Sequence, residues 1–407
     1  MENKNDFKKA VTLFTLVVIL VAIMSGFSSQ IYTNYFKEVY NVTSVQRGFL
    51  EIPRESPGIL CMFIIAALAP LGDIKSGIFA QILVAAGLTV MAFFSPSYSA
   101  MMLFLFIASS GQHIFMPLND SIGMSLAQDG NVGKTLGRFK TCSTVFSLLT
   151  SLAVFICFKY GIFSFKTHII IPFAIAIVAA VIAAVLLMGM TKYIKTEPKP
   201  KTEKKHSNLV LRKEYTPYYL VTLAYGCQKR IKLVFGPWVI ADLLLKGADT
   251  ISLLAIGTYF IGILIAPVIG RMLDKMGARF SLIVEGIYII IVFSAMGFLA
   301  GGFASGKFIT DTPAMYAAFV VYMLCNVFDQ FNTIHAYLMR SIARDASEIT
   351  ATLSVGLSVD HVIAIVVSAI FGIVWAEIGA QYVFYICAAT AIIQIAVGLS
   401  LKNKARS

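Results

Sequence analysis

Apolar segments of about twenty residues recur from one end of the chain to the other, and this feature constrains the fold most. A helix of that length spans a bilayer's hydrocarbon core, which is roughly 30 Å thick. Within hydrocarbon only helices and closed barrels satisfy their own backbone hydrogen bonds, and the sequence lacks the strict alternation of a barrel strand. We therefore predict an all-α membrane protein with about twelve transmembrane helices. Their approximate limits are 11–36, 45–71, 76–96, 100–127, 136–158, 168–191, 217–242, 250–270, 279–301, 313–339, 350–375 and 380–401.

The composition supports a membrane protein. Of the 407 residues 58% are hydrophobic and 13% are charged, and the mean hydropathy is +0.81. A soluble protein of this length has no use for so much apolar surface, because its core saturates and the remainder faces water. The net charge of +12 does not indicate nucleic-acid binding, because the cations cluster in short polar breaks and not in a nucleic-acid-reading motif.

The sequence contains no motif for bond-making chemistry. A GxxxxGKS/T phosphate loop, an HExxH motif and a GxSxG motif are all missing. The six cysteines lie in apolar stretches without metal-ligand spacing. We therefore expect no catalytic residue, no metal and no cofactor, and we expect neither an enzyme nor an ATP-driven pump. The first apolar run continues to about Phe36, which favours an uncleaved first helix over a signal peptide.

The polar breaks predict the orientation and the domains. The breaks on the side of both termini hold most of the lysines and arginines, so both termini are expected in the cytoplasm and the protein in the cytoplasmic membrane. Trp238 and Trp375 fall near the expected outer helix ends, which predicts an interfacial aromatic belt. A Lys-, Glu- and Pro-rich segment divides the helices six and six. The expected parts are an N-terminal bundle (1–191), a cytoplasmic linker (192–216) and a C-terminal bundle (217–407).

The two halves resemble each other. The stretch SIGMSLAQD closes the fourth predicted helix and HAYLMRSIARD closes the tenth. Aligning them sets His113 opposite Asp329 and Asn119 opposite His335. Two similar six-helix bundles imply a pseudo-two-fold axis with a path between the bundles.

The loop GRMLDKMGAR, after the eighth predicted helix, resembles the signature loop of the major facilitator superfamily. That signature has a glycine, three further residues, an aspartate, a basic residue, a glycine and a second basic residue. The resemblance extends over the chain through its six-plus-six plan, and it implies the major facilitator fold of two pseudo-symmetric bundles and a role in transport. Gly270, Asp274, Lys275, Gly277 and Arg279 fill the signature positions.

In this family the loop latches the two halves in one conformation, so the resemblance implies a latch here. Asp274 can pair with a cation at a cytoplasmic helix end, and Arg340 is the candidate partner. The first-half copy, PLGDIKSG, keeps Asp73, but Ala69 replaces the leading glycine. The alternative is that these charges only hold the loops in water.

Three cations, Lys229, Arg230 and Lys232, lie within four positions of the seventh predicted helix. They are roughly 18–23 Å from its cytoplasmic start, where each ionisable group facing lipid costs about 2.5–3.5 kcal/mol. Lys229 and Lys232 share a face of this helix, and Arg230 points about 100° away. We therefore expect two of the three side chains to line a hydrated pocket and one to pair structurally. Such cations favour a negatively charged substrate. The alternative is a salt-bridge network without a role in binding.

Carboxylates and histidines near mid-bilayer are typical of proton relays. A carboxylate between Lys232 and a proton would couple the two fluxes, and Asp329 and Asp360 are favoured for this role. A structural contact between helices is the alternative for each acid. The other residues expected to couple protons are His361, Asp120 and Glu55, and those expected to bind substrate besides the three cations are Arg54, Gln30, Asn34, Gln112, His113 and Asn332.

Two of these assignments have specific alternatives. Arg54 lies close to the expected outer surface, where snorkelling to the headgroups would also explain it, and Glu285 is interpreted as structural.

These expectations combine into a secondary active transporter that moves a small organic anion or zwitterion with protons by alternating access. We expect symport, with import favoured, by a monomer embedded in the lipid bilayer, with a small molecule and a proton or another coupling ion as its partners. The alternative is a proton-driven efflux pump for drugs or metabolites. The fifth predicted helix weakens this alternative, because it lacks the Gly/Pro-rich signature of such pumps in the family. A transporter-like receptor that binds solute without moving it is the third possibility.

Overall fold

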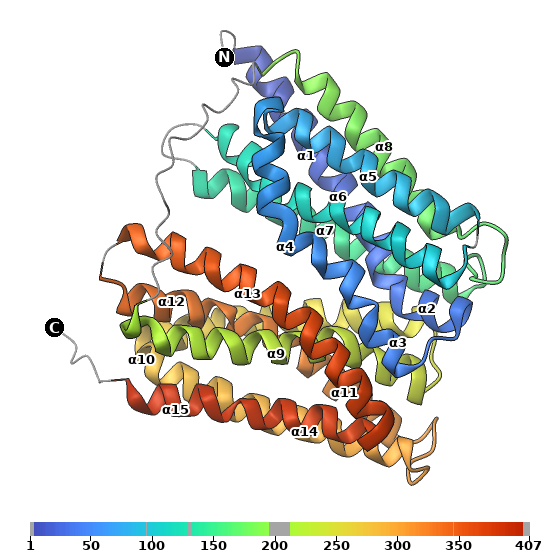
Figure 1. Ribbon diagram of the computed structural model, residues 1–407, viewed down its shortest axis with the longest axis vertical. Helices are drawn as coiled ribbons and strands as arrows, with labels where there is room; N and C mark the ends of the chain where they lie inside the picture. Colours follow the sequence, from blue (N-terminus) through green and yellow to red (C-terminus); the bar gives the residue numbers. More distant parts are fainter. Residues whose placement is uncertain (1–3, 95, 128–131, 195–211, 345, 402–407) are drawn as a thin grey trace. The chain divides into compact units, whose positions relative to one another are not determined.

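The structure is a computed structural model that describes residues 4–94, 96–127, 132–194, 212–344 and 346–401 (Figure 1). In these ranges the chain is helical and contains no strand. The chain forms two compact units, the first comprising Met1–Asn41 with Ile52–Glu203 and the second Val42–Glu51 with Lys204–Ser407. The short segment Val42–Glu51 thus belongs with the second unit, although the first unit flanks it in sequence on both sides.

In the first unit α5 packs between α6 and α8, and α1 packs against α7 and α8. Aromatic and aliphatic side chains such as Phe14, Phe115 and Leu187 form its core. Van der Waals contacts among these side chains pack the helices together, since lipid tails are as apolar as the side chains and burial away from lipid adds little. The elements are α1 (Lys4–Ser28), η1 (Ser29–Ile31), α2 (Tyr32–Tyr40), α4 (Glu51–Leu68, of which Glu51 belongs to the second unit), η2 (Ala69–Leu71), α5 (Asp73–Phe93), α6 (Tyr98–Ser125), α7 (Val132–Lys159) and α8 (Ile171–Met190).

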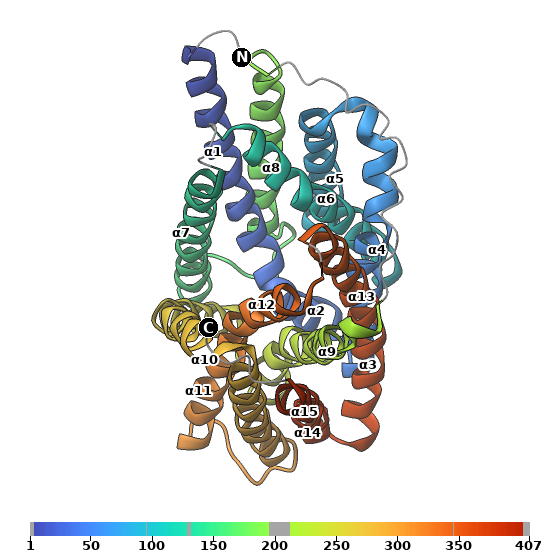
Figure 2. The ribbon, with the colours of Figure 1, turned by 90° about the vertical axis from the view of Figure 1, so that its left-hand side faces the viewer.

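In the second unit α9 is the central helix, and α11 to α15 all contact it (Figure 2). Tyr218, Leu282 and Ile334 belong to the core of this unit. The elements are α3 (Ser44–Phe49), η3 (Lys213–Tyr215), α9 (Thr216–Trp238), η4 (Val239–Leu243), α10 (Ala248–Ala304), α11 (Pro313–Val327), η5 (Phe328–Phe331), α12 (Asn332–Ile342), α13 (Ala346–Ile373), η6 (Val374–Ile378), α14 (Ala380–Thr390) and α15 (Ile392–Ser400).

Helix α10 is two membrane spans joined by a kink. Gly277 inside it has φ 72° and ψ −179°, which is not a helical conformation. Glycine adopts a positive φ without the steric cost that a Cβ would bring. The predicted helices 250–270 and 279–301 lie on the two sides of this residue.

Nine helices in the described part of the chain are long and apolar enough to cross a membrane. One of them is α10, which counts as two spans because of its kink. The helices α4 and α9 are not among these nine, because each carries three charged residues and the nine have at most two in their apolar part. With these two, about twelve spans remain a sound description, and the predicted all-α fold class is confirmed.

The prediction of an interfacial tryptophan belt is wrong. Trp238 is fully buried and Trp375 is nearly so. The ring of Trp375 stacks on Phe235, with ring centroids 5.7 Å apart. The second unit uses both indoles as packing groups, since a large aromatic ring contributes more buried area than most side chains.

Candidate functional site

The candidate site in the second unit is built on α9, whose three cations each pair with a carboxylate from another element. Lys229 pairs with Asp360 of α13, with 2.8 Å between Nζ and Oδ2. The Lys229 side chain is 30% exposed and that of Asp360 is 13% exposed. The pair is therefore partly exposed, and water in contact with it would screen the charges in part.

The second pair joins groups with very different exposure. Nζ of Lys232 lies 2.6 Å from Oδ2 of Asp329, which belongs to the short helix η5. The Lys232 side chain is 1% exposed, whereas that of Asp329 is 51% exposed. A buried ammonium is thus compensated by a carboxylate that is half exposed. Loss of the carboxylate's charge would leave the ammonium buried without compensation, which is costly.

Arg230 points to a different face and is buried. Its guanidinium lies 3.2 Å from Oε2 of Glu51, and Arg47 of α3 lies 2.8 Å from the other oxygen of the same carboxylate. All three side chains are buried. This cluster ties α3 to α9, and its burial suits structural support more than contact with a solute.

Neutral hydrogen bonds position α9 next to these charges. Gln228 and Gln394 of α15 exchange amide hydrogen bonds of 3.2 and 2.8 Å, and Gln228 also donates to the Thr390 hydroxyl at 2.9 Å. Both glutamines are fully buried. Because each buried amide group has a partner, the helix is fixed in rotation and the three cations keep their directions.

A buried histidine–carboxylate pair contacts Tyr225, which precedes Lys229 by one turn of α9. Nε2 of His335 lies 2.9 Å from Oε1 of Glu285, and both side chains are buried. The ring of Tyr225 contacts the imidazole edge-on, with ring centroids 4.6 Å apart. No sequence pattern predicts this pair, because its two residues are 50 positions apart and only the packing of α10 against α12 brings them together.

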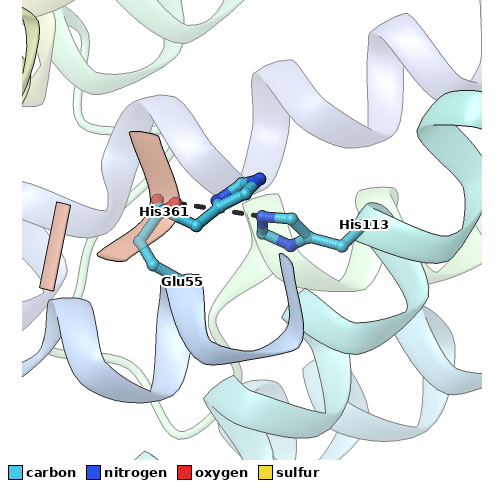
Figure 3. A group of neighbouring side chains, drawn as sticks. All are labelled: Glu55, His113 and His361. Carbon is cyan, nitrogen blue, oxygen red and sulfur yellow. Dashed lines mark ion pairs between the residues drawn. The ribbon is translucent and has the colours of Figure 1, made fainter. Parts of the chain in front are cut away.

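In the first unit Glu55 and His113 form a weaker pair. Nε2 of His113 lies 3.9 Å from Oε2 of Glu55, and both side chains are largely buried (Figure 3). Nδ1 of His113 lies 2.9 Å from the Ser109 carbonyl and 3.2 Å from its hydroxyl. The carbonyl fixes Nδ1 as a donor, which leaves Nε2 for Glu55. Arg54 covers the Tyr32 ring, with 5.9 Å from Cζ to the ring centroid.

The remaining polar candidates of the first unit make other contacts. Gln30 accepts a hydrogen bond of 3.0 Å from Ser151, and buried Asn34 donates to Glu38 at 3.4 Å. Gln112 is half-buried and its amide lies 3.9 Å from the Met24 sulfur. Asp120 is exposed and lines a cavity of about 350 Å³.

Two candidates of the second unit remain. Asn332 is exposed at the start of α12, and His361 is half-buried, next to Asp360 in α13.

The predicted latch residues lie at helix ends. Asp73 begins α5 and accepts a hydrogen bond from Ser121, and Arg279 donates to the Leu401 carbonyl at 3.3 Å. Asp274 and Arg340 are both exposed, and the structure records no ion pair between these two described residues. In this conformation the expected contact is not made. Gly270 and Lys275 lie on α10 near the kink at Gly277.

The sequence matches the family model of the Major Facilitator Superfamily over residues 14–359. The chain belongs to the major facilitator superfamily. The resemblance carried by the GRMLDKMGAR loop is thereby confirmed, and with it a general role in transport. No curated protein matches the sequence of this superfamily member.

Solved structures of transporters share the fold. A mutant of the nucleoside transporter NupG superposes with a TM-score of 0.73 at 13% identity, covering 96% of this chain and 99% of that chain. A mutant of the peptide transporter POT in complex with sulfate gives 0.72 at 15% identity, covering 96% and 93%. A bacterial homologue of the iron transporter ferroportin, in an inward-facing state, gives 0.73 at 14% identity, covering 96% and 98%. At these identities the likeness is one of fold.

Proposed function

We propose that this member of the superfamily is a secondary active transporter that moves a small organic anion or zwitterion across the cytoplasmic membrane together with protons. The observation that carries the proposal is the Lys232–Asp329 pair, a buried ammonium whose carboxylate partner is half exposed. The sequence led us to expect a cation already open to the substrate. The ion pair changes the expected mechanism, because a substrate must displace a carboxylate.

The pair gives a physical route to coupling. With Asp329 ionised, Lys232 is satisfied and a second anion near it would be repelled by the carboxylate. With Asp329 protonated, Lys232 keeps its charge only if another anion replaces the carboxylate. Proton binding and anion binding therefore favour each other, and this reciprocity is what symport requires. A relative of the same fold is solved in complex with sulfate, which agrees with an anion site in such a fold.

Lys229 and Asp360 would form a second exchangeable pair. Both side chains are partly exposed, so water or a substrate group reaches them. Since Lys229 and Lys232 are three residues apart on one face of α9, a substrate with two charged groups could engage both. We assign the buried Arg230 to support of the site and not to substrate contact.

The other assignments are proposals of the same kind. They include alternating access by the two halves, a monomer, both termini in the cytoplasm, and a latch that forms between Asp274 and Arg340 in another conformation. The polar residues of the first unit stay candidates for contact with substrate or protons: Gln30, Asn34, Arg54, Glu55, Gln112, His113 and Asp120. Asn332 and His361 stay candidates in the second unit.

A thermal-shift screen of metabolite anions on the purified protein would select ligands, since a ligand bound only by the folded form raises Tm. The leading ligands would then be tested for uptake into proteoliposomes under an imposed pH gradient. We expect accumulation that follows the gradient and disappears when a protonophore collapses it. Lys232→Gln should abolish ligand binding, whereas Lys246→Gln should not, because Lys246 pairs with the exposed Asp311. Undiminished anion binding by Lys232→Gln would refute the proposal.

The efflux pump remains the second candidate, and one observation favours it. Each cation of α9 already has a carboxylate partner, so the site is close to electrically balanced and suits uncharged compounds too. An efflux pump would bind mainly apolar compounds and would tolerate Lys229→Gln and Lys232→Gln. A receptor would bind its solute but never move it across the liposome membrane under any gradient.

A further inference from the structure

A cavity in the first unit is lined by cations that are not part of the site on α9. It measures about 270 Å³ and lies where α1, the end of α6 and the start of α7 meet. Lys134 and Arg138 line it, both exposed, and no described lining residue is acidic. The neighbouring cavity differs, because Lys140 and Asp120 both line it and their charges offset each other. The first cavity therefore has a net positive lining.

The lining residues form two stripes along neighbouring helices. Residues four apart lie on one helical face, and the two helices that supply the stripes pack against each other. Each stripe runs over nine residues, that is eight steps of 1.5 Å, so the cavity extends about 12 Å along the helix axes. The stripes are Lys134, Arg138 and Cys142 on α7 and Phe7, Val11 and Thr15 on α1.

The cavity has a charged part and an apolar part. Lys134 and Arg138 occupy the first two turns of α7, where the N-terminal end of the helix adds positive potential. Phe139 and Leu126, both buried, line the apolar part together with Val11. A small hydrophilic anion would contact the cations and leave the apolar wall unused. An amphiphilic anion would contact both.

We propose that this cavity binds the headgroup of an anionic phospholipid. The cavity lies at helix ends, which is the depth of headgroups in a bilayer, and basic pockets between transmembrane helices are known to suit anionic headgroups. The phosphate would lie between Lys134 and Arg138, and the first carbons of an acyl chain would follow the apolar wall towards Cys142.

Cys142 at the deep end of the cavity provides a direct readout. A variant that keeps Cys142 and replaces the other five cysteines with alanine would be reconstituted in phosphatidylcholine vesicles with or without phosphatidylglycerol. The rate of alkylation by a small maleimide would then be measured. If the site is about nine-tenths occupied, phosphatidylglycerol should slow the reaction about tenfold, because only the empty fraction reacts. The matched control keeps Cys157 near the other end of α7 and should react equally in both vesicles.

Charge variants distinguish a lipid headgroup from a free anion. Lys134→Gln with Arg138→Gln should remove the protection of Cys142, whereas Lys159→Gln with Lys166→Gln, an equal loss of charge near the opposite end of α7, should keep it. Inorganic phosphate added to phosphatidylcholine vesicles should not protect Cys142. Equal alkylation of Cys142 in both vesicles would overturn the proposal, and so would full protection by inorganic phosphate alone.

A second measurement uses the chain with all its cysteines, in case the single-cysteine variant fails to fold. In detergent, a short-chain phosphatidylglycerol should raise Tm more than a phosphatidylcholine with the same chains. The difference should vanish in the Lys134→Gln/Arg138→Gln variant and persist in the Lys159→Gln/Lys166→Gln variant. An equal effect of the two lipids on the unsubstituted chain would overturn the proposal.

Discussion

Glu51 is the residue on which the buried charges of the second unit depend most. Its two carboxylate oxygens accept hydrogen bonds from Arg47 and Arg230, and all three side chains are buried. Breaking such a pair costs more than its formation contributes, because the remaining charge stays buried.

We expect Glu51→Gln to destabilise the protein by about 3–5 kcal/mol, since two buried guanidinium groups would lose the negative charge of this carboxylate. The melting temperature in detergent would measure the effect. Glu214→Gln is the control, because its pair with Arg344 is exposed and should contribute roughly 0–1 kcal/mol. Equal melting temperatures for the two variants would show that Glu51 does not hold a buried charge cluster.

The buried Glu285–His335 pair should be structural. Glu285→Leu or His335→Leu alone leaves one polar group buried without its partner and should lower Tm clearly. The double variant replaces both groups with apolar ones and should recover most of the loss. It should also keep pH-driven uptake. A double variant that melts normally but no longer accumulates substrate would instead assign the pair to proton transfer.

At this scale the sequence predicted that the cations of α9 need compensation and offered Asp329 and Asp360 as candidate carboxylates, but it did not predict which acid pairs with which cation. A cation in an apolar helix must be compensated, so Lys229, Arg230 and Lys232 were recognisable from position alone. Their partners lie 97 to 179 residues away in sequence, and Glu51, the partner of Arg230, precedes it. Only the packing of α9 against other helices decides which acid pairs with which cation. Glu51 therefore escaped prediction as a member of the site.

At the scale of elements, sequence patterns did not reveal the contact between α3 and α13. A Cβ on Gly48 would lie 2.2 Å from the Ser368 carbonyl oxygen, and one on Gly372 would lie 2.7 Å from the Ser44 carbonyl oxygen. The backbones of α3 and α13 thus touch directly. The sequence predicted one continuous helix over 45–71, because a break at Leu50 between two helical segments has no hydropathy signal.

Gly48→Ala should separate α3 from α13 and lower the stability by about 1–3 kcal/mol, as overpacking does. Gly137→Ala on α7 is the matched control, since a Cβ there meets nothing within 4 Å and should be neutral or slightly stabilising. The melting temperatures of the two variants would be compared. If both melt like the unsubstituted protein, the close approach of α3 and α13 does not exist in solution.

For the whole molecule, hydropathy was sufficient for the fold. Each apolar run is long enough to span the hydrocarbon core and can do so only as a helix, because its backbone groups have no water to bond. Twelve such helices are compatible with few folds. Within α10 the sequence predicted two separate membrane spans, because GRMLDKMGAR between them is too polar to lie within hydrocarbon. The site was less predictable. Whether an ion pair such as Lys232–Asp329 is structural or can open for a substrate depends on the exposure of each side chain, which only the folded structure gives.

Proton uptake during anion binding tests the central claim most directly. The purified protein would be titrated, in weakly buffered solution near the pH of half-maximal binding, with the strongest anion from the thermal-shift screen. Coupling through the Lys232–Asp329 pair predicts net proton uptake of up to about one proton for each anion bound, together with affinity that falls as the pH rises. Asp329→Asn should bind the anion without proton uptake and with little dependence on pH. Anion binding by the unsubstituted protein without any proton uptake would contradict the account.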